Sequence, residues 1–162
     1  MLASSRSTAS NAEANRVFDE LQADLKDAQL ARDKLRTQAL KALKAGLHNE
    51  QIEQGGQLTD EQRLQVAQRE IKKRKEAADM YQAAGREEQA QLERDEIEVL
   101  QKYLPAPLTS DELIDIIQSA IDEADATSVQ DMGKVMALVS PQVTGRADKA
   151  EVAVTVKDLL SA

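Results

Sequence analysis

The 162-residue chain contains no cysteine. Disulfides and thiolate chemistry are therefore excluded, and a reducing compartment suits such a sequence. Aromatic residues make up only 2% of the chain, so the core must be aliphatic and the usual stacking platform for single-stranded bases is scarce. No apolar run approaches the roughly 20 residues that a membrane-spanning helix needs. We therefore expect a soluble, cytoplasmic protein with no membrane partner.

Glycine and proline are also few, with six and three residues. Abundant Ala, Leu, Gln, Glu and Lys favour helices over a β-sandwich or barrel. Apolar residues recur at spacings of three and four, which places them on one face of a helix. This period predicts helices over 17–28, 35–52, 59–84, 86–104 and 109–121, and a short one from about 131 to 139. Residues 151–160 fit either a strand or a helix, and helix is preferred because no partner strand is visible. The predicted fold class is all-α.

Two prolines within three residues, Pro105 and Pro107, mark the best candidate for a domain boundary, because the residue before each proline avoids helical angles. We place the boundary at 104–108. It separates a larger N-terminal helical domain, 16–104, from a small C-terminal three-helix domain, 105–162. Residues 1–15 are small and polar, and we expect a loose extension or a frayed helix start.

Several helix ends can be read from side chains. Capping boxes are predicted from Thr59, Thr109 and Ser128, each with an acid or Gln three residues later, and Asp148 repeats the spacing before the last helix. Ser140-Pro141 is expected to end the short helix.

Charge is unevenly distributed around a net value of −8. Residues 105–162 carry ten acids and four basic residues, a net −6, and three of these cations lie in or beside 131–148: Lys134, Arg146 and Lys149. A second basic cluster, REIKKRK at 69–75, contains Arg69, Lys72, Lys73, Arg74 and Lys75. Each cluster is either a contact site for phosphates or acids, or a set of surface cations that pair with nearby carboxylates. The overall acidity weighs against broad, non-specific nucleic-acid binding.

The sequence shows no reaction centre. Neither G-x-x-x-x-G-K-[ST] nor G-x-G-x-x-G occurs. The single histidine, His48, has no second histidine or cysteine with which to bind zinc, and no serine is placed for a Ser–His–Asp arrangement. We therefore predict no catalytic residues, no metal site and no cofactor.

Together, these segments resemble the GatB/YqeY family, and specifically its stand-alone YqeY-like proteins, over residues 16–162. The resemblance rests on DMGKVM (131–136) and GRAD (145–148), which eight residues separate. It is strengthened by LRTQALKALKAGLHNEQIE (35–53), REIKKRKEAADMYQAAGRE (69–87) and EIEVLQKYLPAPLT (96–109). The family often has glycine where this chain has Ala137 and Lys149.

The resemblance implies an all-helical protein whose small domain is similar to the tail of the B subunit of glutamine-dependent Asp/Glu-tRNA amidotransferase, which is associated with tRNA. The leading hypothesis is a tRNA- or translation-associated binding module, with the residues of the two basic clusters as its contacts. One alternative is an accessory component of a carbon–nitrogen ligase with glutamine as amido-N-donor, whose partners would be amidotransferase subunits. Another is a helical adaptor that binds another protein.

Overall fold

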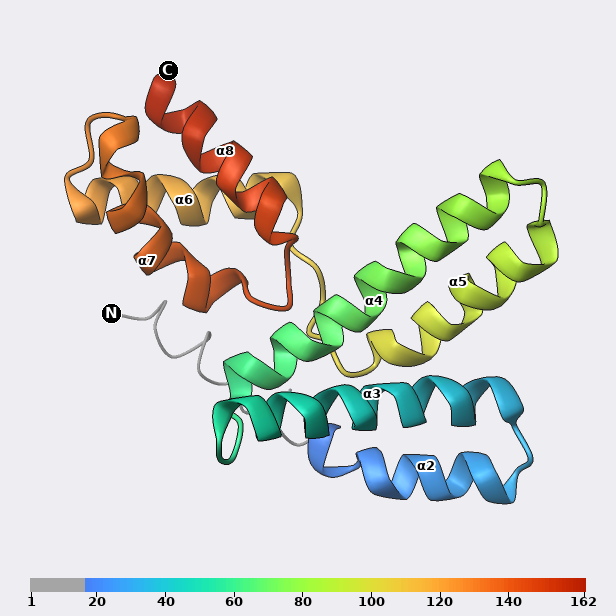
Figure 1. The fold of residues 1–162 in the computed structure, drawn as a ribbon. Coiled ribbons are helices and arrows are strands. Elements are labelled where there is room, and N and C mark those ends of the chain that lie inside the picture. The colour runs from blue at the N-terminus through green and yellow to red at the C-terminus, as the bar shows by residue number, and fades with distance from the viewer. Residues whose placement is uncertain (1–16) are drawn as a thin grey trace. The chain divides into compact units, whose positions relative to one another are not determined.

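The computed structural model describes residues 17–162, so the extension expected at 1–15 lies outside the described residues. Over this range the chain is helical and contains no strand, which confirms the all-α prediction (Figure 1). None of the helices in this range has the length and apolar character of a membrane span. The elements are α2 (Leu21–Leu30), α3 (Lys34–Gln54), α4 (Asp60–Ala83), α5 (Glu87–Gln101), α6 (Ser110–Ala124), the 3₁₀ helix η1 (Val129–Asp131), α7 (Met132–Val143) and α8 (Lys149–Ser161).

The backbone divides into two compact units between Pro105 and Ala106. The N-terminal unit contains α2 to α5 and the C-terminal unit contains α6 to α8, and each buries its own cluster of aliphatic side chains. The division falls within the predicted boundary at 104–108. That each unit folds as an independent domain stays a prediction.

Four helices of the N-terminal unit enclose a core in which Leu40, Leu43, Leu100 and Tyr103 are almost fully buried. Helices α4 and α5 form a hairpin whose turn requires Gly85 in the left-handed region, at φ 75°. This is the position at which glycine carries no Cβ penalty.

One predicted core position in α5 was wrong. The spacing of apolar residues in 86–104 predicts a buried face made of Leu92, Val99, Leu100 and Tyr103, yet Leu92 is 54% exposed, whereas Ala90 and Ile97 are buried. Leu92 follows Ala90 by two residues, which on a helix is about 200° of rotation. It therefore points away from the face that packs on the core.

Helix α3 runs unbroken through Gly46, and its neighbour α4 supplies the reason. A Cβ at this position would lie 3.2 Å from both Glu70 Oε1 and Val66 Cγ1. Glycine therefore lets α3 and α4 approach closely, at a helix-propensity cost of about 1 kcal/mol relative to alanine.

The C-terminal unit packs three helices around Ile117, Val135, Val139, Val152 and Val156. Its helix starts follow the predicted caps. The hydroxyl of Thr109 accepts from Glu112 N–H, Ser128 and Asp131 form a capping box, and the carboxylate of Asp148 accepts from the amides of Ala150 and Glu151. Residues 149–161 are helical, as preferred from the sequence.

The prediction that Ser140-Pro141 ends the short helix was wrong, because α7 continues to Val143. Proline removes one N–H donor, but the next residues rebuild the turn: Thr144 donates to Ser140 O through its amide at 3.1 Å and its hydroxyl at 2.7 Å. Extending the helix also buries Val143 against the core. Pro141 itself is exposed, so its ring displaces no packed neighbour.

Candidate functional site

Only part of the basic cluster on α4 faces solvent. Arg74 is 8% exposed and bridges two helices, with Nη1 2.9 Å from Glu70 Oε2 and Nε 2.7 Å from Glu96 Oε2. Burial lowers the pKa of Arg74, but the two carboxylates outweigh that effect and raise it above its ordinary value. The guanidinium of Arg74 therefore joins α4 to α5 inside the N-terminal unit and is closed to a partner.

Two further cations of this cluster are paired along a hollow of about 470 Å³ between α3 and α4. Arg69 Nη2 lies 2.6 Å from Glu50 Oε2, and Lys73 Nζ lies 3.4 Å from Glu70 Oε1. The hydrogen bond from Arg69 holds the pKa of Glu50 below its usual value. These two ion pairs partly neutralise the positive charge of the basic cluster on α4.

Lys72 and Lys75 complete the cluster on α4. Both are exposed and form no ion pair among residues 17–162. The five cations that stand together in the sequence therefore divide in space: one is internal, two are paired and two are free at the surface.

Lys134 is the most open of the candidates in the C-terminal unit. Its side chain is 72% exposed, and its Nζ lies 3.9 Å from Asp131 Oδ1. Asp131 is committed to the fold, because its carboxylate accepts from the amides of Thr127 and Ser128, which lower its pKa. Beside it, Gly133 has open space where a Cβ would be. The first turn of α7 thus presents a cation next to an uncovered stretch of helix surface.

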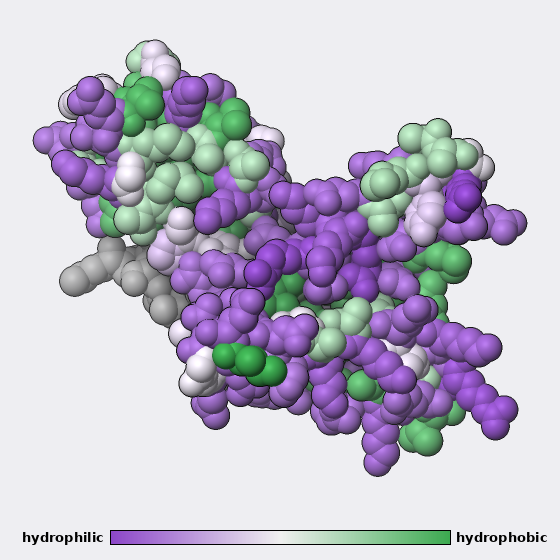
Figure 2. All heavy atoms as spheres, viewed as in Figure 1, coloured by the Kyte–Doolittle hydropathy of each residue, from purple (hydrophilic) through white to green (hydrophobic). Residues whose placement is uncertain are grey.

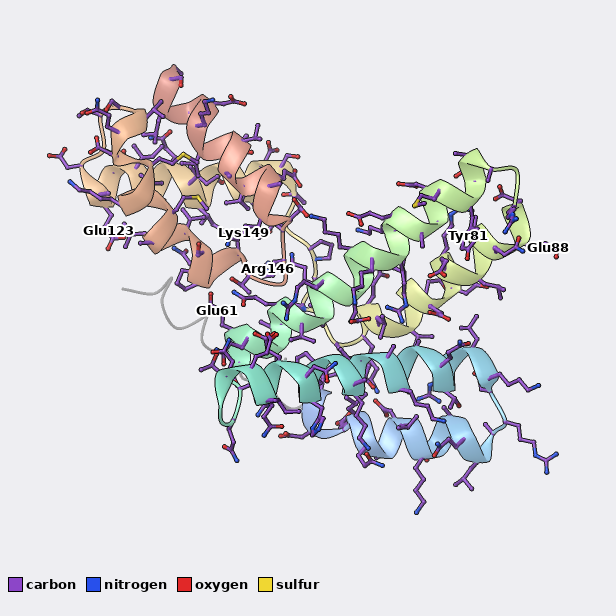
Figure 3. The ribbon with its side chains drawn as sticks, viewed as in Figure 1. Glu61, Tyr81, Glu88, Glu123, Arg146 and Lys149 are labelled. Carbon is purple, nitrogen blue, oxygen red and sulfur yellow. The ribbon has the colours of Figure 1, made fainter. Side chains whose placement is uncertain are left out.

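Arg146 forms its contacts within the C-terminal unit. Its Nε donates to Ala106 O at 3.2 Å, its Nη2 lies 3.9 Å from Glu112, and its carbonyl accepts from Leu108 N–H at 2.9 Å. It therefore ties residues 106–112 to the connection between α7 and α8. Lys149 is exposed at the start of α8 on the same connection (Figure 3).

The structure does not bring Lys134 together with Arg146 and Lys149. Lys134 lies in the first turn of α7, whereas the other two follow its last turn. The helix between them rises roughly 14 Å. The motifs DMGKVM and GRAD therefore place their cations at opposite ends of α7.

Sequence reasoning missed a buried polar cluster around Asp24, which is 8% exposed. Its carboxylate accepts from Tyr103 Oη at 2.5 Å and from Lys102 Nζ at 3.0 Å, and Arg36 Nη2 lies 4.0 Å away. Burial raises the pKa of Asp24, but these donors and charges outweigh it and hold the pKa below its usual value. A signal existed, because Asp24 stands three residues after Leu21 and so falls on the apolar face of its helix.

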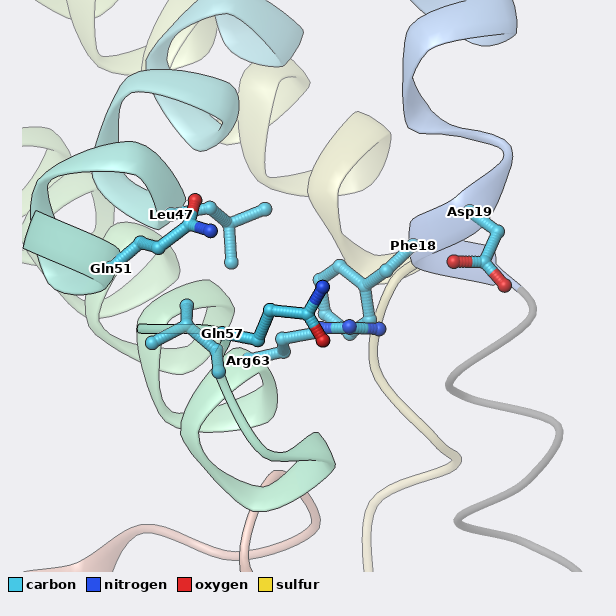
Figure 4. Close-up of a pocket in the computed structure, with 7 residues that line it drawn as sticks. Phe18, Asp19, Leu47, Gln51, Gln57 and Arg63 are labelled. Atoms are coloured by element: carbon cyan, nitrogen blue, oxygen red, sulfur yellow. The ribbon is translucent and has the colours of Figure 1, made fainter. Parts of the chain in front are cut away.

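A second hollow of about 280 Å³ also lies in the N-terminal unit (Figure 4). The described residues that line it are Phe18, Asp19, Leu47, Gln51, Gln57, Leu58 and Arg63. They include no pairing of a nucleophile with a base. Likewise, no group of histidine and carboxylate side chains within 17–162 could hold a metal ion.

The chain is similar to two fungal proteins. A fungal relative from Clavispora lusitaniae, "Altered inheritance of mitochondria protein 41, mitochondrial", is 28% identical over 99 residues, which is 60% of this chain and 58% of the relative. A protein of the same name from Pyrenophora tritici-repentis is 28% identical over 144 residues, 85% of this chain and 76% of that protein. The chain thus spans little more than half of the first relative. The family model described as "Yqey-like protein" matches residues 18–160, and the chain therefore belongs to the YqeY-like protein family.

Proposed function

We propose that this chain is a tRNA- or translation-associated RNA-binding protein without an active site of its own. The YqeY-like family is related to the C-terminal domain of the amidotransferase B subunit, and this relation supports RNA as the partner. The proposal includes two domains, 16–104 and 105–162, each of which contributes cations.

The observation that carries the proposal is the open first turn of α7. No neighbour lies within 4 Å of the point where a Cβ on Gly133 would stand, so packing does not require glycine there, and glycine costs helix stability relative to alanine. A missing Cβ allows a ligand to approach the backbone closely. Lys134 stands next to it with an exposed ammonium group, which is suited to contact a phosphate.

The mechanism is phosphate contact by lysine rather than anion binding at helix ends. The amides that begin α8 are already bonded to Asp148, and Gln130 N–H at the start of η1 is bonded to Ser128. A phosphate would have to displace these caps. Exposed ammonium groups such as those of Lys134 and Lys149 need no such displacement, and they contact the nucleic-acid backbone without reading its sequence.

The test is a filter-binding titration with bulk tRNA at about 50 mM and about 200 mM salt, because phosphate contacts weaken steeply with salt. The variant Lys134→Gln should weaken binding and make the slope of log K against log salt shallower by about 1. The matched control is Lys157→Gln, an exposed lysine on α8 outside both clusters. The proposal fails if the unaltered chain does not bind at about 50 mM salt.

The alternatives give different results in native affinity purification. Recovery of amidotransferase subunits would favour the accessory-component hypothesis, and a stoichiometric protein without RNA would favour a helical adaptor. Both relatives carry "mitochondrial" in their names, so a mitochondrial location competes with the cytoplasmic one, which stays a prediction.

A further inference from the structure

Between Lys34 and Asn49, the solvent face of α3 carries three lysines and no carboxylate. Lys34, Lys41 and Lys44 are exposed there, as is the side chain of His48, whereas the acids of α3, Glu50 and Glu53, lie in its last turns. In a chain of net charge −8, such a face is unusual. Hydrophilic residues cover most of the visible surface over α2 and α3 (Figure 2).

The first turn of α3 holds two cations, Lys34 and Arg36, and no acid, whereas α4, α5, α6 and α8 each have an acid there. The amino end of a helix favours acids, and in α3 the acid is the N-cap, Asp33, whose carboxylate accepts from Arg36 N–H at 3.1 Å. The guanidinium of Arg36 also lies 4.0 Å from Asp24. Lys34 has no ion-pair partner among residues 17–162, so its ammonium group is available to a partner.

The three lysines stand at a spacing that keeps them on one line. Lys41 follows Lys34 by seven residues and Lys44 by three more, so they cover about 15 Å of helix, and His48 extends the line to about 21 Å. Lys41, like Lys34, is unpaired within the described part of the chain. Lys44 is held in place by a 2.7 Å hydrogen bond to Gln22 on α2.

The α3–α4 hollow lies beside this line and limits it. Ala45 and Asn49 form the edge of the hollow on α3, and Arg69 and Lys73 line it from α4, but Glu50, Glu53 and Glu70 line it too. Because Arg69 and Lys73 are paired with Glu50 and Glu70, the hollow adds no net positive charge. A polyanion that lies along α3 would therefore contact the lysines of α3 rather than the hollow.

From this arrangement we infer that the α3 face, defined by Lys34, Lys41, Lys44 and His48, binds the sugar–phosphate backbone of double-helical RNA. The inference rests on the proposed function and adds the surface and the kind of RNA. Single-stranded RNA is disfavoured because its binding uses aromatic platforms, whereas Phe18 and Tyr103 are buried and the remaining aromatic, Tyr81, is partly buried on α4 rather than on α3. A membrane surface is disfavoured because an interfacial helix needs a wide apolar face exposed beside its cations, whereas the apolar face of α3 packs inside the unit.

The experiment measures binding of a 12-base-pair RNA duplex by fluorescence anisotropy at several salt concentrations. The double variant Lys34→Gln/Lys41→Gln should bind at least about tenfold more weakly near 0.1 M salt, and its salt slope should be shallower by about 2. Its melting temperature should not fall, because a cation leaves the amino end of α3. Lys34→Arg/Lys41→Arg should retain binding.

The matched control is Arg86→Gln/Lys157→Gln, which changes net charge equally at two exposed cations that do not belong to α3. The inference is overturned if this control weakens binding as much, or if Lys34→Gln/Lys41→Gln binds like the unaltered chain. In the latter case the proposed function survives, since it fails only when the unaltered chain does not bind tRNA. Sedimentation velocity tests a different occupant of this face. If the unaltered chain self-associates, and Lys34→Gln/Lys41→Gln abolishes this self-association but leaves duplex binding unchanged, the α3 face instead binds the acidic C-terminal unit of a second copy.

Discussion

The buried hydrogen bond between Tyr103 and Asp24 should make a measurable contribution to the stability of the N-terminal unit. Tyr103 is 1% exposed and its hydroxyl donates to a carboxylate that is itself buried. A hydrogen bond to a charged group contributes about 1.5–3 kcal/mol. In Tyr103→Phe the carboxylate keeps Lys102 at 3.0 Å, so the loss stays below the ~3–5 kcal/mol expected for an unpaired buried charge. We expect a loss of about 2 kcal/mol, within the range for a hydrogen bond to a charged group.

Urea unfolding followed by circular dichroism at 222 nm is the assay. Because the free energy of unfolding falls by about 1–3 kcal/mol per molar urea, the urea midpoint of Tyr103→Phe should be lower by roughly 1 M. Phenylalanine keeps the ring that packs against Phe18, with a centroid separation of 5.8 Å, so lost packing should add little. The control is Tyr81→Phe, because Tyr81 is only partly buried and its hydroxyl has no partner in the described range. A loss below about 0.5 kcal/mol for Tyr103→Phe, the size of an ordinary surface effect, would refute the reasoning.

The same pair predicts a pH dependence. The pKa of Asp24 is lower in the folded chain than its ordinary value of 3.8, so its contribution is present above that value and is lost as the pH falls through the folded pKa. Tyr103→Phe removes one donor and should raise the pKa of Asp24. The stability difference between the two chains should therefore be constant near neutral pH and shrink below about pH 4. A difference that stays constant down to pH 2 would contradict the assignment to an ionised carboxylate.

Two further predictions concern packing. Gly133→Ala should stabilise the chain by about 0.5–1 kcal/mol because the site is open. Gly46→Ala should instead destabilise it by about 1 kcal/mol or more, because its Cβ would press on Glu70, which Arg74 holds in place. Equal changes of the thermal midpoint in the two variants would show that α4 shifts to accommodate the added methyl group. Arg74→Met should cost about 3 kcal/mol, the lower end of the range for a broken buried pair, because the buried Glu70 keeps only Lys73 at 3.4 Å and the partly buried Glu96 loses its cation. A shift in thermal midpoint no larger than that of an exposed-site variant would argue against an internal bridge.

Local patterns accounted for much of the fold. The caps at Thr59, Thr109 and Asp148 were predictable because each involves residues three apart, and the helix ends follow from them. Errors arose where packing overrode a local rule. Pro141 lies inside α7 because Val143 gains burial beyond it, and Leu92 faces solvent because the rotation of α5 is set by the core.

The candidate site was less predictable than the fold. The cations of 69–75 are adjacent in sequence, yet only tertiary contacts show that Arg74 is internal and that Lys72 and Lys75 are free. The α3 face was present in the sequence as an acid-free run, but its exposure depends on which side of α3 packs against α2 and α4.

By itself, the amino-acid sequence determined the helical class, the placement of most helices and the lack of thiol chemistry, because these depend on composition and on contacts between near neighbours. The tertiary structure alone decided which charges are paired, since Arg74 on α4 meets Glu96 on α5, and Asp24 on α2 meets Tyr103, which follows α5. Charge in a sequence is a property of single residues, whereas its availability to a partner depends on distances that only folding sets.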